Sequence, residues 1–187
     1  MASPNTERNT TLAYSDLYTS PKQAMEALCE VVSFDKDKTY FEPCSGIGSV
    51  SNYFKDNLDI TMDTNELFGY SDTTFVEDFL APRKNVCNKW DYDIIVTNPP
   101  YKLAQEFIQE GYKYAKVQYH LLRLNFLEGK KRKKELFSQK HLKRVFIFSY
   151  RISCAKGVME IPQANAVAYC WMEFDRDYIG NPELVWL

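Results

Sequence analysis

The chain has 187 residues, of which 45% are hydrophobic and 15% aromatic, and its formal net charge is −2. This composition excludes a disordered class and suits one domain with a sizeable core. No apolar stretch approaches the ~20 residues that cross a bilayer, and residues 1–11 lack the apolar segment of a secretory signal, so we expect a cytoplasmic protein without membrane contact. The five cysteines form no C-x-x-C pair and are odd in number, which indicates reduced thiols and no metal site.

The order of apolar segments predicts strands that alternate with helices. Runs rich in β-branched and aromatic residues predict strands at residues 39–43, 60–63, 74–76, 91–97, 117–127, 145–148 and 166–174. Apolar residues at helical spacing predict helices at residues 21–32, 50–58 and 103–115. Ser20 is expected to cap the first helix, with Pro21 at its first position. This order indicates an α/β domain with a mostly parallel sheet that ends in an antiparallel hairpin.

Marked polar residues stand at or just after the ends of four predicted strands, namely Glu42, Asp63, Asp78 and Asn98. Open α/β sheets bind ligands at this edge, and glycines at 46 and 48 let a ligand approach the backbone. Asp63 is placed to accept hydrogen bonds from two ribose hydroxyls. The glycine loop lacks the third glycine of a dinucleotide site, and Glu42 suits an ammonium group better than a pyrophosphate. A nucleoside-like cofactor is therefore expected.

The strand at 91–97 stops at Asn98-Pro99-Pro100-Tyr101. Two consecutive prolines fix φ and remove two donors, so the carbonyls of Asn98 and Pro99 are expected to point outward. With the Asn98 amide and the flat Tyr101 ring, they suit a planar group that carries an NH2. The alternative is a Pro-Pro turn that only ends a strand.

Two motifs carry a resemblance to a known family. Residues 41–48, FEPCSGIG, are similar to the first motif of S-adenosylmethionine-dependent methyltransferases, and residues 98–101 resemble the catalytic motif of amino-methyltransferases that act on adenine N6. Residues 16–21 resemble the segment that touches the cofactor ahead of the first motif. The resemblance spans about residues 18–174 and implies a Rossmann-like methyltransferase domain with a seven-stranded sheet and helices on both faces.

The resemblance also implies a role for each matched residue. Glu42 would meet the methionine ammonium, Asp63 the ribose and Asp78 the adenine amino group, while Phe79 packs on the adenine ring. The implied cofactor site comprises Tyr18, Thr19, Glu42, Pro43, Cys44, Gly46, Gly48, Asp63, Asp78, Phe79 and Asn98. The implied catalytic residues are Asn98, Pro99, Pro100 and Tyr101. The Asn98 side-chain oxygen and the Pro99 carbonyl would accept the amine protons, and Tyr101 would stack on a flipped base.

The charge is unevenly distributed. The segment 129–144 carries +7, so the rest of the chain carries −9. Its cations are Lys130, Lys131, Arg132, Lys133, Lys134, Lys140, Lys143 and Arg144. This asymmetry indicates either a footprint for a phosphate backbone or a solvated helix face.

The predicted domain organisation is an N-terminal arm, residues 1–17, and a methyltransferase domain, residues 18–187. The arm is either mobile or an ordered lid. Only 86 residues follow Tyr101, too few for a separate target-recognition domain, so the basic segment and the loop 151–165 are expected to contact the substrate. Small stand-alone proteins of this kind resemble bacteriophage-encoded DNA adenine methyltransferases, which implies the host cytoplasm as the location.

The sequence leaves three functions open. The first is methylation of adenine N6, in DNA rather than RNA. The second is methylation of an adenine or guanine amine in RNA, or of a protein glutamine, by the same motif. The third is a non-catalytic subunit that binds S-adenosylmethionine or nucleic acid. The oligomeric state stays open.

Overall fold

A computed structural model of the chain describes residues 19–81, 92–154 and 167–187. The predicted arm 1–17 and Tyr18 lie outside the described residues. The strands, in chain order, are β1 (Tyr40–Glu42), β2 (Asp63–Thr64), β3 (Tyr92–Thr97), β4 (Ala115–Arg123), β5 (Leu142–Ile147), β6 (Tyr169–Asp175) and β7 (Glu183–Trp186). The α-helices are α2 (Lys22–Val31), α3 (Ser49–Leu58), α4 (Ala104–Gly111) and α5 (Lys130–Glu135), and the short 3₁₀ helices are η1 (Tyr101–Leu103), η2 (Leu124–Leu127) and η3 (Phe137–Gln139).

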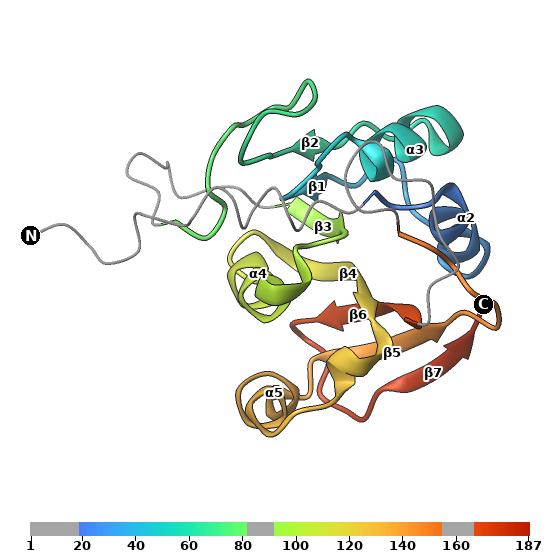
Figure 1. The fold of residues 1–187 in the computed structure, drawn as a ribbon, viewed down its shortest axis with the longest axis vertical. Coiled ribbons are helices and arrows are strands. Elements are labelled where there is room, and N and C mark those ends of the chain that lie inside the picture. The colour runs from blue at the N-terminus through green and yellow to red at the C-terminus, as the bar shows by residue number, and fades with distance from the viewer. Residues whose placement is uncertain (1–18, 82–91, 155–166) are drawn as a thin grey trace, which may run out of the picture.

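The seven strands form one sheet in the order β2-β1-β3-β4-β6-β5-β7 (Figure 1). Strands β2, β1, β3 and β4 run parallel to one another. Strand β6 lies antiparallel to both β4 and β5, and β7 is parallel to β5. Strand β6 is buried on both faces, as its nearly continuous apolar sequence requires. The expected α/β sheet with an antiparallel C-terminal hairpin is confirmed.

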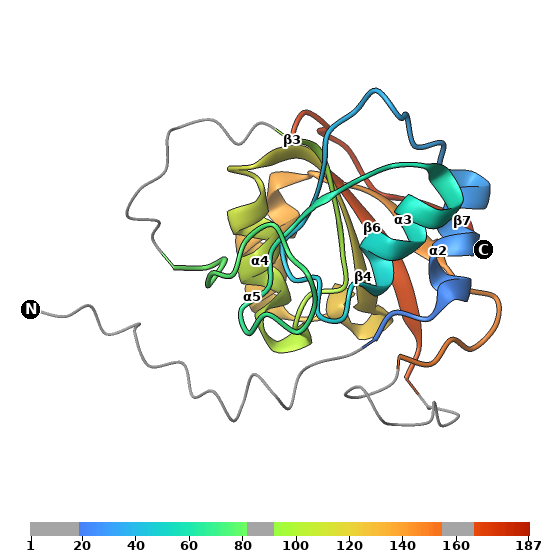
Figure 2. The ribbon, with the colours of Figure 1, turned by 90° about the horizontal axis from the view of Figure 1, so that it is seen from above.

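Helices cover both faces of the sheet (Figure 2). On one face, α2 and α3 bury Leu28 and Phe54 against residues of the sheet such as Val96. The indole N–H of Trp171 on β6 donates a 2.7 Å hydrogen bond to the carbonyl of Ala24 and ties α2 to the sheet. On the other face, α4 packs its apolar side on strands β4, β5 and β6, and Leu136 after α5 joins that core.

Several predicted boundaries are wrong. Strand β2 begins at Asp63, whereas the sequence predicted a strand that ends there. The segment 74–76 contributes one isolated bridge between Asn65 and Phe75, and the seventh strand is instead the unpredicted β7. Helix α4 ends at Gly111, because the chain then turns into β4. The first helix has Pro21 as its N-cap and no side-chain cap, so Ser20 does not cap it.

No helix in the described part of the chain is long and apolar enough to cross a membrane. Within the same residues, no group of three or more His, Cys, Asp or Glu side chains is placed to hold a metal ion.

Candidate active site

The carboxyl ends of the four parallel strands meet at one edge of the sheet. Strand β1 ends there at Glu42, β3 at Thr97 and β4 at Arg123. Glu66 lies just past the end of β2, two residues after Thr64. Parallel strands bring their loops together at this edge, which is where α/β sheets bind ligands.

The glycine loop between β1 and α3 turns tightly at two positions. Gly46 has a φ of 54° and Gly48 a φ of 80°, both in the left-handed region that favours glycine. A Cβ at Gly48 would also lie 3.0 Å from the Asn52 side-chain nitrogen. The Gly46 amide donates a 2.7 Å hydrogen bond to the Glu66 carboxylate. The loop therefore places β1, β2 and the start of α3 around a common point.

Two carboxylates are buried beside this loop. Glu42 is 2% exposed and Glu66 is 7% exposed. Burial raises the pKa of the Glu42 carboxyl to about 8, a hydrogen bond from the Ser51 amide opposes the shift, and the charge of Glu66 adds to it. No Lys, Arg or His among the described residues forms an ion pair with either carboxylate. Because an unpaired buried carboxylate is costly, this pair suits a cationic ligand.

Two uncharged groups next to the carboxylates also have no hydrogen-bond partner among the described residues. The Ser45 hydroxyl and the Asn65 side-chain oxygen are buried and find no hydrogen-bond donor or acceptor in the described part of the chain. The Asn65 amide nitrogen, by contrast, donates to the Pro43 carbonyl at 3.0 Å and fixes the side chain in place. Buried polar groups in native proteins are nearly always satisfied, so these two oxygens favour a polar ligand in the loop.

The structure corrects the position of Asp63. It begins β2, is exposed, and accepts a 2.7 Å hydrogen bond from the Tyr92 hydroxyl. The residue at the ligand edge of β2 is Glu66, which the sequence analysis missed. Glu66 comes 20 positions after Gly46, close to the ~20-residue spacing of the ribose acid in dinucleotide folds. This spacing could have identified Glu66, but Asp63 also follows an apolar run and was predicted instead.

Phe79 does not face the edge as predicted. It is 2% exposed, and its ring lies 5.1 Å from the rings of both Phe107 and Tyr114. These neighbours enclose the Phe79 ring in the core under α4, so core packing accounts for its position. Asp78 is half-buried, and its carboxylate accepts a 3.0 Å hydrogen bond from the Leu80 amide, which closes a turn.

The corner after β3 touches the glycine loop. The Cys44 thiol lies 3.0 Å from the Thr97 hydroxyl and donates to the Asn98 carbonyl at 3.6 Å. The Asn98 carbonyl is thus already used, contrary to the expectation that it points outward. No donor among the described residues bonds the Pro99 carbonyl. The contact at Cys44 brings together the two motifs that the sequence placed more than 50 residues apart.

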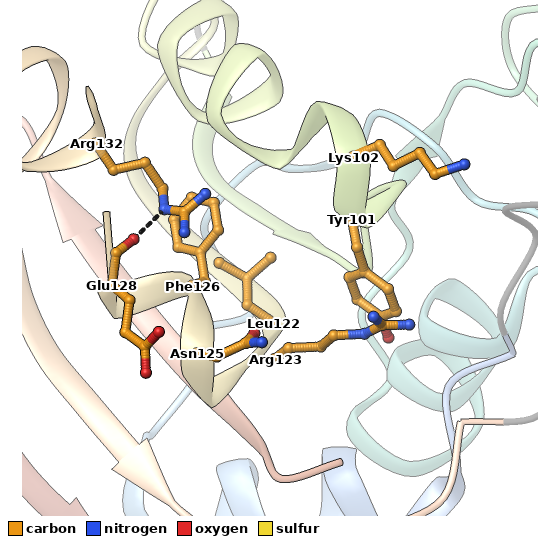
Figure 3. Close-up of a pocket in the computed structure, with 8 residues that line it drawn as sticks. All are labelled: Tyr101, Lys102, Leu122, Arg123, Asn125, Phe126, Glu128 and Arg132. Atoms are coloured by element: carbon orange, nitrogen blue, oxygen red, sulfur yellow. Dashed lines mark hydrogen bonds between the residues drawn. The ribbon is translucent and has the colours of Figure 1, made fainter. Parts of the chain in front are cut away.

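Tyr101 opens η1, and two side chains lie against its ring. The Arg123 guanidinium carbon lies 4.8 Å from the ring centroid, and the Tyr169 ring lies 5.8 Å away. Figure 3 shows the Arg123 side chain extended from the end of β4 to this ring. Tyr101 also lines a cavity of about 290 Å³, together with Lys102, Leu122, Arg123, Asn125, Phe126, Glu128 and Arg132.

The predicted basic residues fall into two groups. Lys130, Lys131, Lys133 and Lys134 are exposed on α5, and Lys140 is exposed after η3, whereas Arg132 turns into the cavity. Arg144 and Lys143 lie on β5 and form ion pairs with Glu173, which is 2% exposed. These two cations pair with a buried acid of the sheet, so ion pairing within the fold already accounts for both.

The structure describes only part of two predicted contact segments, residues 18–19 and the loop 151–165. Thr19 is half-buried next to buried Ser20, whereas Tyr18 lies outside the described residues. Most of the predicted substrate loop 151–165 lies outside the described residues. Its first part is inside them, and there Ile152 and Cys154 are buried in the core on the α2 and α3 face.

No protein-family model and no curated protein matches the sequence. Solved structures do match. The methyltransferase subunit of a type I restriction-modification system from Streptococcus thermophilus superposes with a TM-score of 0.67 over 90% of this chain, at 13% identity. The chain spans about half of that protein, 47% of its length.

Two other solved structures match the same fold. The 23S rRNA methyltransferase ErmE has a TM-score of 0.53 and 13% identity, over 89% of this chain and 72% of its own. The type ISP restriction-modification enzyme LlaBIII, solved bound to DNA, has a TM-score of 0.55 and 10% identity, over 91% of this chain and 19% of its own. The chain has the α/β Rossmann-like fold of methyltransferases.

Proposed function

We propose that the protein is an S-adenosylmethionine-dependent methyltransferase that acts on the N6 amino group of adenine in DNA. The observation that carries this proposal is the contact between the Cys44 thiol and the Asn98 carbonyl. It sets a glycine loop with two unpaired buried carboxylates directly against a corner suited to an exocyclic amine. A methyl donor and an amine acceptor would therefore bind side by side.

The residues of the loop fit the cofactor. Glu42 and Glu66 are buried and have no cationic partner among the described residues, and the cofactor carries two cations, an ammonium and a sulfonium. We assign Glu42 to the ammonium. We assign Glu66 to the ribose hydroxyls in place of Asp63, because it lies at the ligand edge of β2 next to Gly46. The Ser45 hydroxyl and the Asn65 oxygen offer further hydrogen bonds in the same loop.

When bound at Glu42 and Glu66, S-adenosylmethionine would supply a methyl group for the amine; the transfer would exchange one C–S bond for one N–C bond, leave a neutral thioether and release one amine proton to water. The task of the chain is to make the amine a better nucleophile. The amine lone pair is delocalised into the purine ring. Hydrogen bonds from the amine to the Asn98 side-chain oxygen and the Pro99 carbonyl would draw the nitrogen toward a tetrahedral geometry and localise that pair. Positioning and preorganised dipoles do this work without a strong base.

The target base would stack on Tyr101. In duplex DNA the base must first leave the helix, at a cost of a few kcal/mol, and stacking on an aromatic ring returns about 1–3 kcal/mol. The exposed lysines of α5 would attract the phosphate backbone without reading its sequence.

LlaBIII was solved with DNA, and ErmE is described as a 23S rRNA methyltransferase, so fold neighbours of both kinds exist. We favour DNA, and RNA adenine is the alternative that the same corner would serve. Protein glutamine is less compatible with the basic helix α5.

The test is incubation of the protein with methyl-labelled S-adenosylmethionine and, separately, DNA, RNA and protein. The expected product is N6-methyladenine in DNA, identified by mass spectrometry of the nucleosides. Asn98→Ala is the catalytic control, because it removes the side-chain acceptor and should abolish labelling. Label in none of the three substrates, or full label with Asn98→Ala, would overturn the proposal.

A further inference from the structure

The cavity next to Tyr101 is built around two arginines that each lie on an aromatic ring. The Arg123 guanidinium lies 4.8 Å from the Tyr101 centroid, and the Arg132 guanidinium lies 4.9 Å from the Phe126 centroid. Arg123 comes from the end of β4 and Arg132 from the middle of α5. Both line the same cavity of about 290 Å³. Stacking holds a guanidinium in a plane and lowers the entropy cost of using its fork of donors.

Arg132 is fixed by a second contact. Its Nε donates a 2.8 Å hydrogen bond to the Glu128 carbonyl, drawn as the dashed line in Figure 3. No acceptor in the described part of the chain bonds its two terminal nitrogens. The side chain is therefore half-buried and oriented, with its outer donors still available to a ligand.

The other polar groups of the cavity leave it positive. Figure 3 shows the Glu128 carboxylate directed away from Arg132 and the Lys102 amine directed away from the cavity, while the Arg123 guanidinium lies at Tyr101 on one side and the Arg132 guanidinium at Phe126 on the other. Asn125, on the same wall, offers both a donor and an acceptor. A second cavity of about 390 Å³ shares Asn125 and Glu128 with the first and continues along the same surface.

We propose that this cavity binds the nucleotides next to the target base, with one backbone phosphate on the Arg132 guanidinium and a neighbouring phosphate on that of Arg123. Planar guanidiniums suit the paired oxygens of a phosphate, and the Asn125 amide suits the edge of a base. The cavity starts at Tyr101, which the proposed function assigns to the target base, so the inference rests on that function. It assigns a phosphate-binding residue, Arg132, to helix α5, whose other cations are exposed to solvent.

The alternative is that α5 attracts nucleic acid through its net charge alone. Two neighbouring residues of α5 distinguish the cavity proposal from this alternative, because Arg132 lines the cavity while Lys133 is exposed to solvent. Neutralising either residue removes one positive charge from the same helix. Only the loss of Arg132 removes a fixed donor from the cavity.

The experiment measures binding of a fluorescently labelled single-stranded 12-mer DNA by anisotropy. Arg132→Gln should weaken binding about tenfold, as expected for one charge-assisted hydrogen bond to an ion, and Lys133→Gln only about twofold. The difference should persist when salt is raised, because screening removes the contribution of exposed charges first. Arg132→Lys, which keeps the charge, should still bind several-fold more weakly than wild type, because an ammonium lacks the fork. Arg123→Gln should match Arg132→Gln.

Equal losses for Arg132→Gln and Lys133→Gln, or full rescue by Arg132→Lys, would overturn the proposal. Thermal melting identifies variants that fail to fold, and Arg132 at the half-exposed rim is the safer of the two arginines to replace. Cofactor affinity, measured by calorimetry on the same variants, should stay unchanged. If the wild type transfers methyl groups but Arg132→Gln and Lys133→Gln lose binding equally, the cavity proposal fails and the proposed function stands. An Arg132-dependent site without methyl transfer on any polymer would refute the proposed function and leave the cavity standing.

Discussion

The Gly46 amide donates a 2.7 Å hydrogen bond to the Glu66 carboxylate, so the glycine loop after β1 is held by an acid that follows β2. The same carboxylate accepts a hydrogen bond from the Leu67 amide at 2.9 Å. Glu66 is thus fixed at the ligand edge, 7% exposed and without a described cation. It is placed where the sequence analysis expected Asp63.

Replacing Glu66 should weaken cofactor binding more than replacing Asp63. Glu66→Gln keeps the shape but removes the charge, and loss of a charge-assisted hydrogen bond of roughly 1.5–3 kcal/mol predicts a loss of at least tenfold in affinity. Asp63→Asn should bind the cofactor within about twofold of wild type, because its carboxylate is exposed at the start of β2. Calorimetry with S-adenosylmethionine measures both. A larger loss for Asp63→Asn would restore the ribose role to that residue.

The stability of the ligand-free protein should fall as pH rises from 7 to 8. Burial raises the pKa of Glu42 to about 8 from an ordinary value of 4.5, so the native state holds a proton that the unfolded state has released. A raised pKa gives stability that is fully present below the unfolded value and is lost as pH rises through the native value. The slope from one proton is up to about 1.4 kcal/mol per pH unit.

Urea unfolding at several pH values between 7 and 8 measures this slope, and Glu42→Gln should flatten it. The interval from pH 7 to 8 also avoids any contribution from His120. Burial lowers the pKa of the His120 ring from 6.5 to about 3, so this ring destabilises the fold only as pH falls below 6.5. If wild type and Glu42→Gln show the same slope, the Glu42 carboxyl is ionised in the native state, contrary to the prediction.

The ring of Tyr101, and not its hydroxyl, should matter for nucleic-acid binding. Tyr101→Ala removes the stacking surface, which predicts a loss of about 1–3 kcal/mol, or roughly five- to 150-fold in affinity for single-stranded DNA. Tyr101→Phe keeps the ring and the contact with Arg123, so its affinity should stay within a few-fold of wild type. Anisotropy with the labelled 12-mer separates the two variants. Equal losses in both would assign the effect to the hydroxyl.

Arg144 should be a stability residue. Its guanidinium pairs with Glu173, which is 2% exposed, so Arg144→Met leaves a buried carboxylate whose remaining ion-pair partner among the described residues is Lys143 at 3.5 Å. Breaking one side of a buried pair predicts a loss of roughly 3–5 kcal/mol in the free energy of unfolding. Urea denaturation measures it. The double variant Arg144→Met with Glu173→Leu should recover much of the loss, because it removes both charges, and failure to recover would point to packing instead.

Local sequence patterns predicted most of the elements correctly. The apolar run before Asn98, the glycine loop after Glu42 and the helical spacing in α2 and α3 each depend on neighbours in the chain. Strand β7 was missed because its four residues, Glu183–Trp186, are mostly exposed and form a strand only by pairing with β5. Arg144 and Arg132 look equivalent in a basic segment, yet one meets a buried acid and the other a cavity.

The sequence by itself determined the α/β fold, the glycine loop and the rigid Asn98–Tyr101 corner, because helix and strand periodicity, glycine freedom and proline geometry are local properties of the chain. Only the tertiary structure decided which side chains share the ligand edge. Strand register places Glu66 rather than Asp63 beside Gly46, and core packing encloses Phe79. Arg123 at the end of β4 and Arg132 on α5 line one cavity. Register and packing are set by contacts between segments distant in sequence, and no local pattern contains them.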